Sequence, residues 1–450
     1  MRKQQNKTFL HLMILVTTTL GLLVSCKNEK PEPYQAPEPQ QKLIPQPFPT
    51  TYGFPVSEAT LIGYTQDYTN PKNIEGIYTH AWQIWAGLTQ MTDLETENGH
   101  KIRVFESWRT PQQIKSEDRI NDKNLFPLTV PHQLGHGVGL DSINETQLAG
   151  FVKYSPAAEK HVVEQGIFDQ KVAKSLIKSG ANQIIGFPVK SIMIKPVFLP
   201  VNLANGKDTI HVWQGPPKDT IRTWDQNDWP NSLIKVVKSK SEADGKTKFA
   251  ISDFINFKVD KNFTEPFGNF EHGDYAVLVG MHVMTKETTR WTWQSFWWSQ
   301  YPDTPHFPSS KLHASYRSNV TLDDAASHYA MTAAYSTKIP AQPYINGQNI
   351  GESLYAYNPY LEAGFGPSGS NNPVLLGENE SGIYNGKTVQ NNYGIQTNCM
   401  SCHIQARWPQ NNSSLNYNGN RYVDFQQSYG KDTLQLDFLW SVNATLGSIK

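Results

Sequence analysis

Hydrophobic positions in the first half of the chain recur with a helical period in two stretches. Over residues 77–88 apolar side chains lie three and four positions apart, and the same spacing returns over 156–179, after a proline and before a glycine. Between these helices, the alternation of apolar and polar residues over 101–108 predicts a strand. A third helix is expected over 325–335.

Residues 183–300 have the pattern of strands. Short β-branched or aromatic runs are separated there by Gly, Pro, Asn and Asp, which is typical of an antiparallel sandwich or a strongly twisted sheet. With the flanking helices, the predicted fold class is α+β: a β-rich body followed by a loop-rich C-terminal segment. The strands are expected over 191–199, 207–213, 232–237, 249–256, 275–284 and 290–298.

Cys399, Cys402 and His403 form the pattern C-x-x-C-H, the attachment signature of a c-type haem. Two thiols at this spacing reach the two vinyl groups of the porphyrin, and the adjacent imidazole ligates the iron from one side. A dithiol redox pair would not require His403, and a structural zinc site would need four ligands close together. The sequence therefore predicts one covalent haem c with His403 as an axial iron ligand.

The N-terminus has the pattern of an exported lipoprotein. A basic start precedes an apolar stretch over 9–24, which is shorter than the ~20 residues of a membrane span. It ends in Leu-Val-Ser-Cys, which resembles the bacterial lipobox, so Cys26 is predicted to be lipidated. Lys27 is not the aspartate that retains many lipoproteins at the inner membrane, and this favours an outer-membrane anchor facing the periplasm or the cell surface.

These patterns divide the chain into four parts. Residues 1–26 are the predicted signal peptide, and 27–50 are a Pro-rich tether of extended chain. Residues 51–310 are expected to form a mixed helical and β-rich body. Residues 311–450 are expected to form a loop-rich haem c-binding region packed on that body.

The cysteine count and the net charge limit the kinds of covalent link and binding partner that the chain can have. The chain has three cysteines, so one for lipid and two for haem leave none for a disulfide. With 40 basic and 40 acidic residues the net charge is zero, and no charged field indicates a nucleic-acid partner. The expected partners are redox proteins and, through the acyl anchor, a lipid membrane.

The second axial position of the iron has no obvious ligand. The chain after His403 contains neither Met nor His, so a sixth ligand must come from upstream, be an unusual donor, or be water. We name His282 as the candidate, because it lies in an apolar strand where an unpartnered polar group costs about 1–3 kcal/mol. A backbone carbonyl or Glu287 could satisfy it instead. Further candidates are Met281 and Met284 on opposite faces of that strand, and His328 and Met331 one turn apart on the helix over 325–335.

Two other features are weaker signals. Arg407 could pair bidentately with a haem propionate, although an ordinary solvated arginine explains it equally well. His132 and His136 would suit a metal only on a helix, whereas the neighbouring glycines indicate a loop and no third ligand follows.

Five short segments in the second half of the chain carry a resemblance. They are GMHVMTKE at 280–287, WTWQSF at 291–296, NPYLE at 358–362, NCMSCH at 398–403 and DFLW at 437–440. Together they resemble an uncharacterised family of bacterial exported proteins labelled "cytochrome c family protein". The resemblance implies one covalent haem in a larger body, with electron transfer as the default role. It supplies no substrate and no sixth ligand.

Three functions remain compatible with these patterns. A membrane-anchored electron carrier in the periplasm or at the cell surface is favoured. A haem enzyme or a gas or small-molecule sensor with an open distal iron is the alternative, because a carrier needs only about one small domain. A binding protein could use the aromatic run 291–298, although such runs in strands are more often core. Whether the protein is an enzyme stays open.

Overall fold

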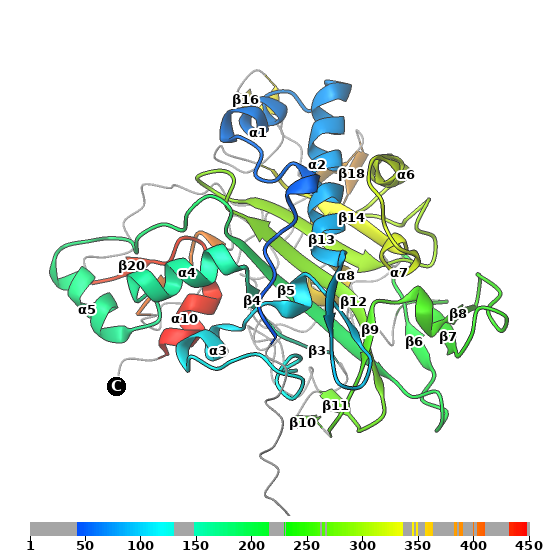
Figure 1. Cartoon of the computed structure of the whole chain (residues 1–450). Coiled ribbons are helices and arrows are strands. Elements are labelled where there is room, and N and C mark those ends of the chain that lie inside the picture. The colour runs from blue at the N-terminus through cyan, green and yellow to red at the C-terminus, as the bar shows by residue number, and fades with distance from the viewer. Residues whose placement is uncertain are drawn as a thin grey trace, which may run out of the picture. The chain divides into compact units, whose positions relative to one another are not determined.

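The computed structural model describes most of the chain after residue 42. From Gln41 to Lys450 the chain forms one compact unit, and Figure 1 colours its elements in chain order. Cys26, Cys402 and the two histidines at 132 and 136 lie outside the described residues. The described residues are 43–129, 148–215, 229, 231–261, 263–265, 268–335, 344–345, 348–349, 356–362, 382–384, 387–389, 399, 403–409 and 432–447.

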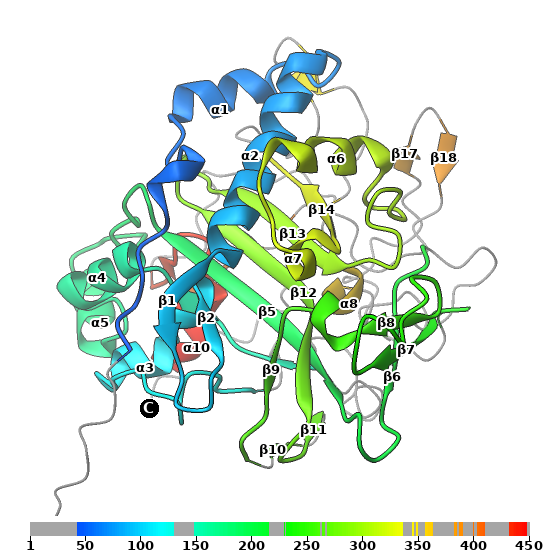
Figure 2. The same cartoon turned by 45° about the vertical axis from the view of Figure 1, so that its right-hand side comes forward.

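A seven-stranded antiparallel sheet lies at the centre of this unit. Its strands are β3 (Ala149–Gly150), β4 (Lys153–Tyr154), β5 (Ile192–Val201), β9 (Asn256–Lys258), β12 (Tyr275–Thr285), β13 (Thr292–Trp298) and β14 (Tyr329–Ala333). Five of them follow the order β14-β13-β12-β5-β3, while β4 pairs with β5 and β9 pairs with β12 (Figures 1 and 2). The predicted strands over 191–199, 275–284 and 290–298 are thus confirmed as the three long central strands.

Both faces of this sheet are buried. Every residue of β13 and nearly every residue of β5 is shielded from solvent, which explains why these runs are almost continuously apolar. Successive side chains of a strand point to opposite faces. Accordingly Met281 packs in one hydrophobic cluster and Met284 in another, as predicted.

One face of the sheet is covered by α2 (Pro71–Thr89), which runs across β12 and β13 in Figures 1 and 2. The Asn70 side chain caps its start, and Pro71 occupies the first turn, where a missing N–H costs nothing. Trp85 of this helix stacks on Phe296 of β13, with 4.5 Å between the ring centroids. The helix predicted over 77–88 is therefore confirmed as the longer α2.

The opposite face is covered by helices from two distant parts of the chain. These are α4 (Pro156–Gln165), α5 (Gln170–Lys178) and α10 (Trp440–Leu446), which lie side by side in Figures 1 and 2. They share a cluster with Met284 and Trp293 of the sheet. Gly166 ends α4 with a φ of 60°, so the single helix expected over 156–179 is two helices.

Shorter elements complete the described structure. The helices and turns are η1 (Thr50–Tyr52), α1 (Glu58–Thr65), η2 (Phe105–Ser107), α3 (Pro111–Lys115), η6 (Ile251–Asp253), α6 (Lys311–Ser315), η7 (Tyr316–Asn319), α7 (Asp324–Ser327) and α8 (Pro359–Glu362). The strands, in small two- or three-stranded sheets, are β1 (Met91–Glu95), β2 (Lys101–Arg103), β6 (Thr209–His211), β7 (Leu233–Val237), β8 (Lys248–Ala250), β10 (Phe263–Glu265), β11 (Gly268–Phe270), β15 (Tyr344–Ile345), β16 (Gln348–Asn349), β17 (Gly382–Tyr384), β18 (Lys387–Val389), β19 (Arg407–Trp408) and β20 (Leu434–Gln435). The predicted α+β class is confirmed.

The helix predicted over 325–335 is wrong beyond its first turn. α7 ends before His328, and the residues that follow form β14, the edge strand paired with β13. The alanines there favour a helix, but pairing with β13 buries Met331 completely, and this tertiary contact overrides the local propensity. His328 and Met331 therefore do not share a helix face.

Two predicted strands are interrupted by turns. Of residues 101–108 only β2 is a strand, because Phe105–Ser107 forms a 3₁₀ turn. Residues 249–256 are likewise divided, since η6 separates the end of β8 from the start of β9.

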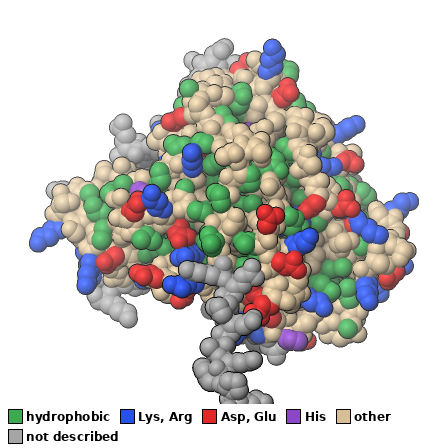
Figure 3. All heavy atoms as spheres, in the orientation of Figure 1, with side chains coloured by type: hydrophobic (Ala, Val, Ile, Leu, Met, Phe, Trp, Pro, Cys, Tyr) green, Lys and Arg blue, Asp and Glu red, His purple; other side chains and the backbone are tan. Residues whose placement is uncertain are grey.

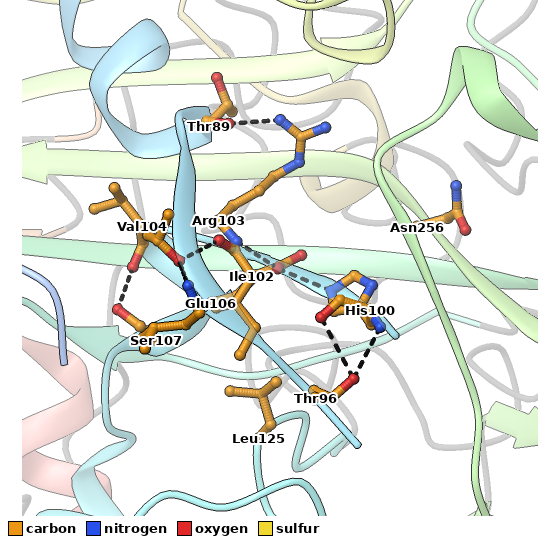
Figure 4. A network of polar contacts seen from close by, with 12 residues as sticks. Thr89, Thr96, His100, Ile102, Arg103, Val104, Glu106, Ser107, Leu125 and Asn256 are labelled. Carbon is orange, nitrogen blue, oxygen red and sulfur yellow. Dashed lines mark hydrogen bonds and ion pairs between the residues drawn. The ribbon is translucent and has the colours of Figure 1, made fainter. Parts of the chain in front are cut away.

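Polar groups buried around β2 and η2 form the network in Figure 4. The Glu106 carboxylate accepts the backbone N–H of Arg103 at 2.8 Å and lies 3.0 Å from Nε2 of His100. Lys153 of β4 is 0% exposed and donates to the backbone carbonyls of Glu106 and Leu125. Burial lowers the pKa of Lys153 to about 7, although the Glu106 carboxylate opposes this.

Replacing this lysine, Lys153→Met, should remove part of the pH dependence of stability. An unfolded lysine has a pKa of about 10.4, so between about pH 7 and pH 10 the unfolded chain binds more protons here than the folded chain. The unfolding free energy of the wild type relative to the variant should therefore rise with pH, by at most about 1.4 kcal/mol per pH unit. Urea denaturation across this window measures it, with the exposed Lys238→Met as control. A difference that does not change with pH would contradict the prediction.

Candidate functional site

His403 is held against the sheet by its ring and by one ring nitrogen. Its Nδ1 lies 2.7 Å from the backbone carbonyl oxygen of Phe438, and its ring centroid lies 4.6 Å from that of Trp293 in β13. A carbonyl oxygen can only accept, so Nδ1 carries the proton and donates. Nε2 then keeps its lone pair, which is the form in which an imidazole binds a metal.

The electrostatic surroundings keep His403 neutral. Burial lowers its pKa to about 4, and the electrostatic influence of His282 and Lys195 acts in the same direction. The Phe438 carbonyl and the Glu362 carboxylate oppose this. A neutral imidazole at physiological pH is available as a ligand without first losing a proton.

Cys399 lies against the same apolar cluster that contains Trp293. It is half-buried, and its thiol lies 3.5 Å from the carbonyl oxygen of Ala356. A thiol and a neutral imidazole thus meet one apolar surface, an arrangement compatible with a covalently bound porphyrin, and the haem itself stays a prediction. Among the described residues no group of three or more His, Cys, Asp or Glu could hold a metal ion, but an iron held in a porphyrin does not require one.

A row of polar side chains crosses the sheet on the same face. Lys195 pairs in register with His282, His282 with Ser295, and Ser295 with Thr332. We call these four residues the polar row. Ser295 and Trp293 are two positions apart in β13, so the row lies on the face that packs against His403.

His282 is bonded at both ring nitrogens. Its Nε2 lies 2.6 Å from a carboxylate oxygen of Glu362 in α8, and its Nδ1 lies 3.0 Å from the hydroxyl oxygen of Ser295. Glu287, which the sequence offered as a partner for His282, lies 3.0 Å from Nε2 of His80 instead. To bind iron, His282 would have to give up one of its two bonds, and its role as sixth ligand stays a prediction.

Asn358 fixes this arrangement in place. Its side-chain amide donates to the Ser295 hydroxyl and to the Phe296 carbonyl, both at 2.9 Å, and its backbone N–H donates to Glu362. Gly280 makes room for it, since a Cβ at that position would lie 2.8 Å from the Asn358 amide oxygen. A glycine is therefore needed at position 280 so that the Asn358 side chain can approach the strand closely, and not because the backbone turns there.

The other candidate ligands are divided between the two faces. Met281 and Met331 pack in the cluster that contains α2, on the far face from His403. Met284 packs with Trp293 on the near face. His328 stacks on Trp298, with 5.9 Å between the ring centroids.

Arg407 begins β19 and is half-buried, close to His403 in the chain. Its backbone carbonyl accepts a hydrogen bond from Asn443 of α10 at 2.7 Å. Pairing with a propionate stays a prediction for this residue. The tryptophans of the 291–298 run are buried in the core rather than displayed on a binding face.

Comparison with protein-family models, curated proteins and solved structures finds no match to this chain. The resemblance to cytochrome c family proteins therefore rests on the segments quoted above and stays a prediction.

Sequence reasoning missed most of the polar partners of His282. Lys195 and Ser295 each interrupt an otherwise apolar or aromatic run, and this is the signal that could have identified them. Asn358 and Glu362 lie in one of the resembling segments, but no local pattern indicates their contact with β12 or β13.

The substitution Gly280→Ala should destabilise the protein, by about 1–3 kcal/mol. The new methyl group would push the Asn358 amide away from Ser295, and three hydrogen bonds hold that side chain and its backbone. Gly63→Ala in the exposed part of α1 is the control, because nothing lies within 4 Å of its Cβ. Chemical denaturation should show the control slightly more stable than the wild type. An equal effect of both substitutions would contradict the packing described for Asn358.

Proposed function

We propose that this protein is a membrane-anchored monohaem c-type cytochrome that takes part in electron transfer in the periplasm or at the cell surface. The observation that carries the proposal is the C-x-x-C-H motif whose histidine donates Nδ1–H to the Phe438 carbonyl. A metal-ligating histidine is commonly oriented in this way, by donating the N–H of its other ring nitrogen to an acceptor such as a backbone carbonyl.

Each residue of the motif has a defined task in this proposal. Cys399 and Cys402 would hold the porphyrin by thioether bonds, and His403 would present Nε2 to the iron. Trp293 packs against the imidazole ring, and the backbone carbonyl of Phe438 accepts the hydrogen bond from its Nδ1, so both restrict the orientation of the ring. The ring of Phe438 in turn packs on Trp293, with 6.1 Å between the ring centroids. The bound haem would supply a one-electron couple, whose potential depends on its ligands and its burial.

The anchor and the partners belong to the same proposal. Cys26 would carry the lipid, with the Pro-rich tether separating the folded unit from an outer membrane. None of the helices in the described ranges is long and apolar enough to cross a bilayer. Acidic and basic side chains are intermingled on the face in Figure 3, which suits transient contact with redox proteins better than binding to nucleic acid.

A second candidate function is supported by the bonds of His282. Since both of its ring nitrogens have partners, the iron could keep an open position, as in a haem enzyme or a gas or small-molecule sensor. Electron transfer to and from the haem is common to both candidates. They differ in whether the iron also binds a small molecule.

Expression of the full chain in a bacterial host with c-type haem maturation tests the proposal. The wild type should carry one covalent haem, seen in the pyridine haemochrome spectrum and as added mass on the peptide containing the motif. Cys399→Ala and Cys402→Ala should each lose a thioether bond and change that spectrum, and the double variant should lose covalent haem.

Cys26→Ser is the matched control for these variants. It should leave the membrane fraction yet keep the haem, because the anchor and the haem depend on different cysteines. A wild type without covalent haem would overturn the proposal.

A further inference from the structure

We infer that Lys286 and Asp437 are positioning residues for His403. Their ion pair holds the Phe438 carbonyl against Nδ1 of the His403 ring and thereby sets the reduction potential of the haem. This inference rests on the proposed covalent haem, and it assigns a role to two residues that the proposed function leaves without one.

The turn that carries the Phe438 carbonyl has an unfavourable backbone conformation. The backbone N–H of Leu439 donates to the carbonyl oxygen of Leu436 at 2.9 Å, which closes the turn. Asp437 and Phe438 between them have φ values of 46° and 71°. Turns with positive φ at both central residues favour Asn or Asp followed by Gly, and a phenylalanine in the left-handed region costs about 1–3 kcal/mol. Contacts outside the turn must therefore hold it in this conformation.

The Asp437 carboxylate supplies these contacts. Lys286, just beyond the end of β12, donates to both of its oxygens, at 2.7 Å and 3.0 Å. The backbone N–H of Phe187 donates to one of the same oxygens at 2.8 Å. The side chains of Lys286 and Asp437 are each only 11% exposed. Separating such a pair is costly, because each charge would be left shielded from water without its partner.

Trp291 adds a third support to the turn. Its indole N–H donates to the backbone carbonyl oxygen of Asp437 at 3.1 Å, and the Lys286 ammonium lies 5.0 Å from the centroid of its ring. Trp291 itself has a φ of 62°. Three of the six non-glycine residues with positive φ in the described part of the chain thus lie around one ion pair. Residues in this conformation cluster at functional sites, because the surrounding contacts must hold them there.

The carbonyl held in this way acts on the proposed iron ligand. Nδ1 of His403 donates to the Phe438 carbonyl oxygen at 2.7 Å, although the two residues are 35 positions apart in the chain. An acceptor at Nδ1 makes the imidazole a more basic ligand through Nε2. A more basic ligand stabilises oxidised iron more than reduced iron, and this lowers the reduction potential. The position of the turn therefore controls the potential.

Two competing explanations make different predictions. If the ion pair only attaches α10, which begins at Trp440, its loss lowers stability and leaves the potential unchanged. If the charges act on the iron directly, removing the lysine and removing the aspartate shift the potential in opposite directions, because a nearby positive charge raises it and a negative charge lowers it.

Reduction potentials of full-length, haem-loaded variants distinguish these explanations. Lys286→Met and Asp437→Gly should both raise the potential, by at most about 59 mV, which is a tenfold change in the ratio of oxidised to reduced haem. Glycine tolerates the left-handed φ, so Asp437→Gly removes the carboxylate without adding strain. Asp437→Asn removes the charge but keeps an acceptor for Lys286 and Phe187, so it should shift the potential less than Asp437→Gly.

Lys115→Met is the matched control. Lys115 also donates to α10, at 2.7 Å from the carbonyl oxygen of Thr445, near the end of the helix that is further from the turn. The variant should be less stable to urea yet keep the wild-type potential. A crystal structure of Lys286→Met tests the positioning independently of the potential, and it should show the Phe438 carbonyl oxygen more than 3.5 Å from Nδ1 of His403.

Other results would overturn the inference. Opposite shifts of potential in Lys286→Met and Asp437→Gly would make the effect one of charge alone. Unchanged potentials, or a Phe438 carbonyl that keeps its place in Lys286→Met, would leave the ion pair a structural role only, and the proposed electron transfer would survive. A wild type without covalent haem would overturn the proposed function and this inference with it.

Discussion

Burial of both faces of the central sheet is the constraint on which the rest of the structure depends. A polar side chain inside such a sheet costs about 1–3 kcal/mol unless it finds a partner, and β12 and β13 contain several. On the side covered by α2, Glu287, two residues beyond the end of β12, is matched by His80 of α2 at 3.0 Å. On the other, His282 and Ser295 are matched by Glu362 and Asn358. The partners come from distant parts of the chain, so burial of the sheet dictates where α2 and α8 dock.

Local patterns predicted the parts of the fold that local interactions decide. The long central strands and α2 follow from the spacing of apolar residues, and the separation of Met281 from Met284 follows from the period of a strand. The failures lie where tertiary pairing decides. Residues 329–333 have the composition of a helix, yet pairing with β13 makes them a strand. The apolar spacing predicted one continuous helix, but Gly166, whose φ is 60°, divides it into two.

The site shows the same division between local and long-range information. The C-x-x-C-H motif, which predicts a covalent haem, is local and can be recognised in the sequence without a structure. The partner of His282 could not be predicted from the sequence. Glu362 lies 80 positions further along the chain than His282. The packing of Asn358 against Gly280 brings α8, and with it Glu362, close to His282. Lys195 joins them through a third strand.

The central claim is that His403, whose Nδ1–H is donated to the Phe438 carbonyl, would bind the iron of a covalent haem through Nε2. The absorption spectrum of the full-length protein, matured with haem, tests this most directly, because losing the histidine ligand changes the haem bands. The account predicts a covalent haem in the wild type, an altered spectrum in His403→Gly and a return toward the wild-type spectrum when imidazole is added. A wild type without covalent haem, or a spectrum unchanged in His403→Gly, would contradict the account.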